Sequence, residues 1–89
     1  MSIRSDIKES LLELVEIIKA ELSQALENCI LTLINAHEWT IALEIIYSYL
    51  DDNEVQISIH AYNLIQQTAN MIGTKTRNWH SLESQIQEE

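Results

Sequence analysis

Apolar residues recur at the spacing of one helical face through almost the whole chain. The first stretch follows Ser5, a residue type favoured at helix N-caps. Its apolar positions are Ile7, Leu11, Leu14, Val15, Ile18 and Leu22. Ser23 can cap a second helix, with apolar positions at Leu26, Cys29, Ile30, Leu33 and Ile34. We expect a bend or short turn at residues 20–23, although one long helix also satisfies this pattern.

The third stretch, residues 39–50, is apolar over about two-thirds of its helical circumference. Its polar positions share one narrow stripe, formed by Thr40, Glu44, Ser48 and Asp51. Several neighbouring helices are needed to cover so wide an apolar arc. The pattern therefore predicts a central helix that leaves only the stripe for water or a partner, with Ile41 and Ile45 extending its apolar arc.

A fourth helix is predicted to start at Ser58, because Ile57 and Tyr62 flank it at the spacing of a hydrophobic staple. Its expected buried residues are Ala61, Leu64, Ile65, Ala69 and Ile72, and the other side is an amide face of Asn63, Gln66, Gln67 and Asn70. Gly73 is the expected C-cap. A weaker pattern predicts a last helix opened by Thr74 or Thr76, with Trp79, Leu82 and Ile86 on one stripe and Trp79 docked on the central helix.

Length and composition limit the architecture to one domain. The chain has 89 residues, no proline and one glycine, which removes most of the turn chemistry that sheets require. We therefore expect a single all-α domain over residues 1–89, a compact bundle of four to five helices around the helix at about 39–50. The single cysteine, Cys29, is expected in the core. Because the sequence contains neither a signal-peptide pattern nor an apolar run of about 18 residues, we expect a cytoplasmic protein.

Charge is distributed unevenly along the chain, whose net charge is −9. No Lys or Arg occurs between Lys19 and Lys75, while seven acids fall in the first two-thirds of that interval. Nucleic-acid binding depends on neutralising phosphates with cations, so the interval argues against it. A surface of one sign instead favours attraction of a basic partner.

The sequence offers little for catalysis, metals or cofactors. His37-Glu38 begins like a zinc-protease helix, but the second histidine of that motif would stand where the chain has Ile41. The three histidines are separated along the chain, without clustered cysteines or carboxylates at ligand spacing. The Asp-Ser-Leu attachment sequence of acyl carriers and the glycine-rich loops of phosphate sites are also absent. We therefore expect a protein that is not an enzyme and uses no metal or cofactor.

The segment His37-Glu38-Trp39-Thr40-Ile41-Ala42-Leu43-Glu44 resembles the core motif of the Maf-type immunity proteins of bacterial polymorphic toxin and contact-dependent inhibition systems. In that motif an acid and an aromatic precede Ala-Leu-Glu in a hydrophobic helix. The acidic turn 51–54, the helix start at 57–58, the run 62–65 and the late segment 79–82 follow in the family's order, so the similarity covers roughly residues 26–82. Thr40 stands where the family pattern often has glycine.

The resemblance implies a non-catalytic protein that binds and neutralises a cognate toxin. Many such toxins are nucleases with cationic clefts, to which an acidic protein would be steered. The inhibitor would then occlude the active site, either by plugging it or from an adjacent surface. The alternative is a small acidic helical adaptor or regulatory subunit that binds another basic protein.

The expected contact residues are Glu44, Tyr47, Ser48, Asp51, Asp52 and Glu54. Three acids at a helix end are unfavourable toward the helix dipole, so stability does not explain Asp51, Asp52 and Glu54, although a solvated loop is the alternative interpretation. Glu44 suits a structural role slightly better than a contact. Tyr47 borders the polar stripe and is the expected aromatic anchor. The amide face of the fourth helix is a second candidate surface.

Overall fold

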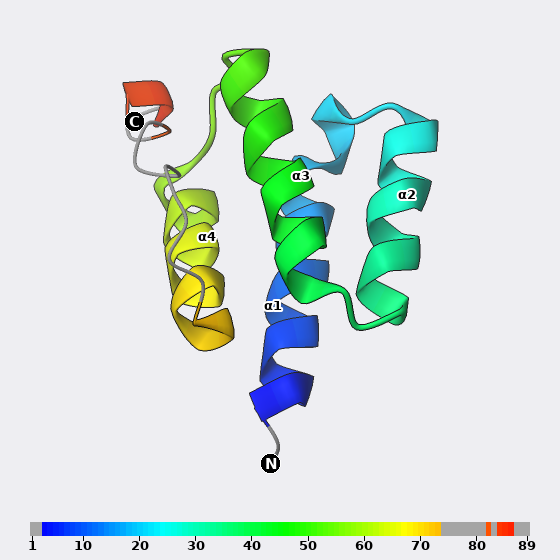
Figure 1. Cartoon of the computed structure of the whole chain (residues 1–89). Helices are drawn as coiled ribbons and strands as arrows, with labels where there is room; N and C mark the ends of the chain where they lie inside the picture. The colour runs from blue at the N-terminus through cyan, green and yellow to red at the C-terminus, as the bar shows by residue number, and fades with distance from the viewer. Residues whose placement is uncertain (1–2, 74–81, 83, 87–89) are drawn as a thin grey trace.

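In the part of the chain that the structure describes, four α-helices run alternately up and down in the bundle (Figure 1). The computed structural model describes residues 3–73, 82 and 84–86. The elements are α1 (Ile3–Ile18), the short 3₁₀ helix η1 (Lys19–Glu21), α2 (Gln24–Asn35), α3 (Trp39–Asp52) and α4 (Ile59–Ile72). The predicted all-α class is confirmed. No helix in the described ranges is long and apolar enough to cross a membrane.

The centre of the bundle consists of α3 together with α1. Each of these two helices contacts the other and also α2 and α4, which lie on either side of the central pair (Figure 1). The prediction of a central α3 is confirmed, and α1 shares that position. The core they form contains Ile7, Leu11, Leu14, Val15, Ile18, Ile30, Ile34, Ala42, Leu43, Ile46, Leu50, Ile57, Ala61, Tyr62, Leu64, Ile65, Ala69 and Leu82.

A turn separates the first two helices, as one of the two alternatives predicted. Leu22 is extended, and the hydroxyl of Ser23 accepts a hydrogen bond from the Leu26 N–H at 3.1 Å. The expectation that Ser5 is an N-cap is wrong, because α1 begins at Ile3 and includes Ser5. In the sequence Ile3 stands four residues before Ile7, so the helical spacing of apolar residues begins before Ser5.

Cys29 and Ile41 are more exposed than predicted. Cys29 is exposed, and only Ile30 and Ile34 are buried on α2. This helix packs mainly against α3 and α1, so its buried stripe is too narrow to include a residue about 100° away from Ile30. Ile41 is 46% exposed. It precedes the exposed Ser48 by seven residues, and the two therefore point in nearly the same direction.

The predicted start and end of α4 are confirmed. The Ser58 hydroxyl accepts a hydrogen bond from the Ala61 N–H at 3.0 Å, and Gly73 ends the helix in the left-handed conformation with φ 82°. Ile57 and Tyr62, the two staple positions, are buried. Ile72, which was expected to be buried, is only half-buried. Thr68 is fully buried, although it was not among the predicted buried residues. Its hydroxyl makes a 2.5 Å hydrogen bond with that of Ser10 across the α1–α4 contact.

The last predicted helix lies mostly outside the described residues, including its start at Thr74 or Thr76 and the docking of Trp79. Of its expected apolar stripe, Leu82 is fully buried and Ile86 is half-buried. Ile86 pairs with Ile57 in an isolated parallel bridge. This part of the chain therefore packs on the bundle as predicted, but at Ile86 it is extended and not helical.

Candidate protein-binding site

The end of α3 carries three exposed acids, Asp51, Asp52 and Glu54, which we call the acidic end of α3. It lies at the upper end of the bundle in Figure 1. Glu54 has a left-handed backbone with φ 50°. Its N–H donates to the Asp51 carbonyl at 3.2 Å, and the Val55 N–H donates to the Leu50 carbonyl at 3.0 Å. These two bonds form a Schellman cap, a motif that usually has glycine where this chain has Glu54.

Both the charge and the backbone at this helix end are unfavourable for stability. Carboxylates near a helix C-terminus oppose the macrodipole, typically by about 0.3–1 kcal/mol each. A left-handed conformation costs a residue with a Cβ about 1–2 kcal/mol relative to the right-handed one. No Lys or Arg occurs anywhere from residue 20 to residue 74 to offset these acids within the sequence. Neither the helix dipole nor the backbone conformation therefore favours acids at these positions.

The remaining predicted contact residues lie on the same side of α3. Tyr47 and Ser48 stand three and four residues after Glu44, and Asp51 stands four and three residues after them, which places all four along one helical face. Ser48 is exposed, whereas Glu44 and Tyr47 are half-buried. Glu44 stands about 10 Å along the helix axis from Asp51. Asp51, Asp52 and Glu54 therefore lie together at one end of α3, and Glu44 lies apart from them. This position favours the structural role of Glu44 over a role as a contact residue.

A hollow of about 560 Å³ opens beside the acidic end of α3. Its lining residues are Asp51, Glu54, Gln56, Ser84, Gln85 and Ile86. The last three come from the carboxy-terminal part of the chain, about 30 residues away in sequence, and were not among the predicted contact residues. Ile86 was placed only on an apolar stripe; no local pattern indicates that Ser84 and Gln85 fold back onto this turn.

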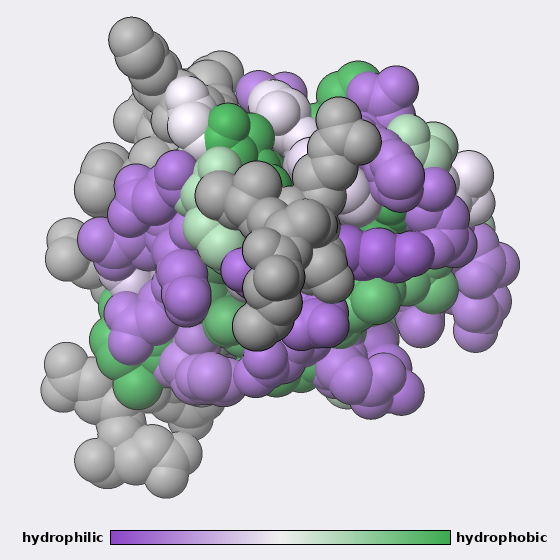
Figure 2. All heavy atoms as spheres, turned by 90° about the horizontal axis from the view of Figure 1, so that it is seen from below, coloured by the Kyte–Doolittle hydropathy of each residue, from purple (hydrophilic) through white to green (hydrophobic). Residues whose placement is uncertain are grey.

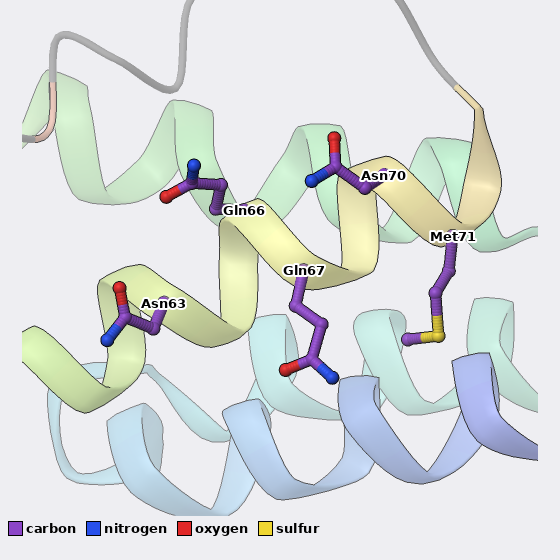
Figure 3. A pocket seen from close by; sticks show the side chains of 5 residues that line it. All are labelled: Asn63, Gln66, Gln67, Asn70 and Met71. Atoms are coloured by element: carbon purple, nitrogen blue, oxygen red, sulfur yellow. The ribbon is translucent and has the colours of Figure 1, made fainter.

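The amide face of α4 forms a second hollow, also of about 560 Å³ (Figure 3). Its lining residues are Asn63, Gln66, Gln67, Asn70 and Met71. Gln67 and Met71 point toward α1, whereas Gln66 and Asn70 point away from it (Figure 3). The four amides are exposed, as predicted. This surface carries no charge, so it offers hydrogen bonds but no long-range attraction.

The nearest cation before the acidic interval is already paired. Lys19 donates to Glu16 at 3.0 Å, and this hydrogen bond and the charge of Glu16 raise the pKa of Lys19. His60 Nε2 lies 2.9 Å from Glu13 Oε2 and joins α4 to α1. Within the described residues, no three His, Cys, Asp or Glu side chains come together as a metal site would require.

The segment that resembles the immunity-protein motif spans the α2–α3 connection and the first half of α3. Ala42 and Leu43 are core residues, and the rings of His37 and Trp39 lie 4.9 Å apart at the connection. Most of the motif therefore builds the fold, and only Glu44 belongs to the predicted contact residues. The chain matches no family model, curated protein or solved structure.

Proposed function

We propose that this protein is a non-catalytic inhibitor that binds a cationic surface of a bacterial toxin with the acidic end of α3, in the cytoplasm. The observation that carries the proposal is the placement of Asp51, Asp52 and Glu54 at a helix end where their charge opposes the dipole. The choice of a toxin, and of a nuclease among toxins, follows from the resemblance of residues 37–44 to Maf-type immunity proteins.

The acids would act in two stages. At long range, their field attracts a cationic cleft and raises the rate of encounter, an effect that is typically tenfold or more at low salt. At short range, carboxylates accept charge-assisted hydrogen bonds from arginine and lysine side chains, with arginine able to bind in a bidentate manner. Ser48 and the half-buried Tyr47 lie beside the acids on α3 and would complete the contact surface. Occupying the cleft excludes the phosphates of the toxin's substrate.

The test uses the polypeptide encoded immediately upstream of this chain's gene. We expect it to arrest cells when expressed alone and to be neutralised when this protein is co-expressed. We also expect the purified pair to associate roughly tenfold more slowly at physiological than at low ionic strength. Absence of a toxin gene upstream together with failure to protect against candidate toxins would favour the adaptor function, while association rates indifferent to salt would refute the electrostatic account.

A further inference from the structure

The carboxy-terminal part of the chain is fastened to the connection between α3 and α4. We call Leu82 and residues 84–86 the C-terminal anchor; it is drawn in red beside this connection in Figure 1. Leu82 is fully buried in the core. The Ile57 N–H donates to the Gln85 carbonyl at 3.0 Å, and Ile57 and Ile86 form a bridge. The anchor is therefore held by both apolar packing and backbone hydrogen bonds.

The side chain of Gln85 binds the acidic end of α3 with two further hydrogen bonds. Its Nε2 donates to the Leu50 carbonyl at 2.8 Å and to the Val55 carbonyl at 2.9 Å. An amide nitrogen has two N–H groups, so each carbonyl receives one. Leu50 and Val55 are also the two ends of the Schellman cap, and the three acids lie between them. One part-buried side chain thus ties together the start and the end of the acidic turn.

We propose that Gln85 is a positioning residue that fixes Asp51 and Glu54 in the orientation in which they meet a cationic partner. This inference rests on the function proposed above. The left-handed backbone of Glu54 is unfavourable by itself and persists because the surrounding structure imposes it. A turn that is ordered before binding loses less conformational entropy when the complex forms, so the benefit of Gln85 appears mainly as slower dissociation.

The variant Gln85→Glu separates positioning from charge. Glutamate has nearly the same shape and adds a negative charge beside the hollow, but an ionised carboxylate cannot donate to the two carbonyls. If charge alone governed binding, this variant would bind the cationic upstream polypeptide faster and more tightly. Positioning by Gln85 predicts the opposite, a roughly tenfold loss of affinity through faster dissociation. Asn28→Asp, at an exposed position in the middle of α2, adds the same charge away from both candidate surfaces and should not weaken binding.

Amide hydrogen exchange provides a readout that needs no partner. In Gln85→Glu, the amides of Glu54, Val55 and Ile57 should exchange faster, while those within α1 and α2 should keep their wild-type rates. Gln85→Leu removes the same hydrogen bonds without adding charge. It replaces Gln85→Glu in these measurements if the glutamate variant does not fold. A double-mutant cycle that combines either variant with Glu54→Gln should give binding free energies that are not additive. If Gln85 acted on the fold alone, the two losses of binding free energy would add.

The outcomes distinguish this inference from the proposed function. Faster exchange at the turn together with weaker binding supports the positioning role. If the wild-type protein binds the upstream polypeptide and the Gln85 variants bind it as tightly, or the turn amides exchange as in the wild type, the positioning role is refuted and the function stands. Failure of the wild-type protein to bind refutes the proposed function itself.

Discussion

The ends of α2 and α3 have the same backbone geometry and different chemistry. At the end of α2, His37 has a left-handed backbone with φ 63°. Its N–H donates to the Ile34 carbonyl at 3.0 Å, and the Glu38 N–H donates to the Leu33 carbonyl at 2.9 Å. This is the Schellman cap that Glu54 forms at the end of α3. The last turn of α2 contains no charged residue, whereas α3 ends with Asp51 and Asp52.

The comparison shows that closing such a helix end requires no acid in this protein. The two ends also lie at opposite ends of the bundle (Figure 1). Figure 2 shows the surface at the end of the bundle that carries the α2–α3 connection. Hydrophilic residues there are interspersed with small apolar patches. Because the same cap forms at α2 without acids in its last turn, the cap itself does not account for the acids of α3.

The largest expected effect comes from reversing the charges at the α3 end. The variant Asp51→Lys, Asp52→Lys, Glu54→Lys should associate with the upstream polypeptide roughly ten- to a hundredfold more slowly at low salt. Its stability should stay equal or rise, since cations are favourable at a helix C-terminus. Stopped-flow association and thermal unfolding measure the two effects.

The matched control reverses three exposed acids elsewhere, with Asp6→Lys and Glu9→Lys on α1 and Glu38→Lys just before α3. It changes the net charge equally but lies away from the proposed site. Equal slowing by the two triple variants would show that only net charge matters and would remove the argument for a local site.

Copying the acids of α3 onto the α2 end should harm stability without improving binding. Asn35→Asp with His37→Glu makes the end of α2 resemble that of α3. The added carboxylates oppose the dipole, so the free energy of unfolding should fall by about 1 kcal/mol in denaturant titrations. Binding should be unchanged. A tighter complex would mean that acids attract the partner wherever they are placed.

Glycine at the left-handed positions should separate stability from binding. Glu54→Gly relieves the backbone and removes an acid from the helix end, and we expect a gain of about 1 kcal/mol in the free energy of unfolding. His37→Gly relieves the same conformation but loses the ring contact with Trp39, so its gain should be smaller. Only Glu54→Gly should weaken binding. Calorimetric titration of both variants checks this, and equal affinities would argue against Glu54 as a contact.

The smallest expected effect concerns the cap residue itself. The Asn53 amide donates to the Tyr49 carbonyl at 2.9 Å, while the equivalent residue of α2, Ala36, has no side chain that could do so. Asn53→Ala should therefore cost about 0.5–1 kcal/mol of unfolding free energy and leave binding nearly unchanged. A large loss of affinity would place Asn53 in the interface.

Much of the fold followed from local patterns in the sequence. The helix starts at Ser23 and Ser58 and the end at Gly73 each depend on residues within a few positions of one another, and all three were predicted. The buried residues of α3 and α4 also followed largely from helical spacing. The errors at Cys29 and Ile41 arose because spacing gives the direction of a side chain but not how much of that direction a neighbouring helix covers.

The missing parts depend on contacts between residues distant in sequence. The Ser10–Thr68 hydrogen bond joins α1 to α4, and the Gln85 amide reaches carbonyls 30 and 35 residues earlier. From the sequence alone, a serine, threonine or glutamine in a helix is predicted to be exposed, because its hydrogen-bond partner is not known. The acids of the candidate site were evident from charge alone, but the hollow beside them and its carboxy-terminal wall were not.

The most direct test of the central claim is to map the contact surface by amide chemical-shift changes when the labelled protein is titrated with the upstream polypeptide. If the acidic end of α3 is the binding site, the largest changes should fall on residues 47–56 and 84–86, which surround it. Changes concentrated on the amide face of α4 or at the α2–α3 connection, with the α3 end unaffected, would contradict it.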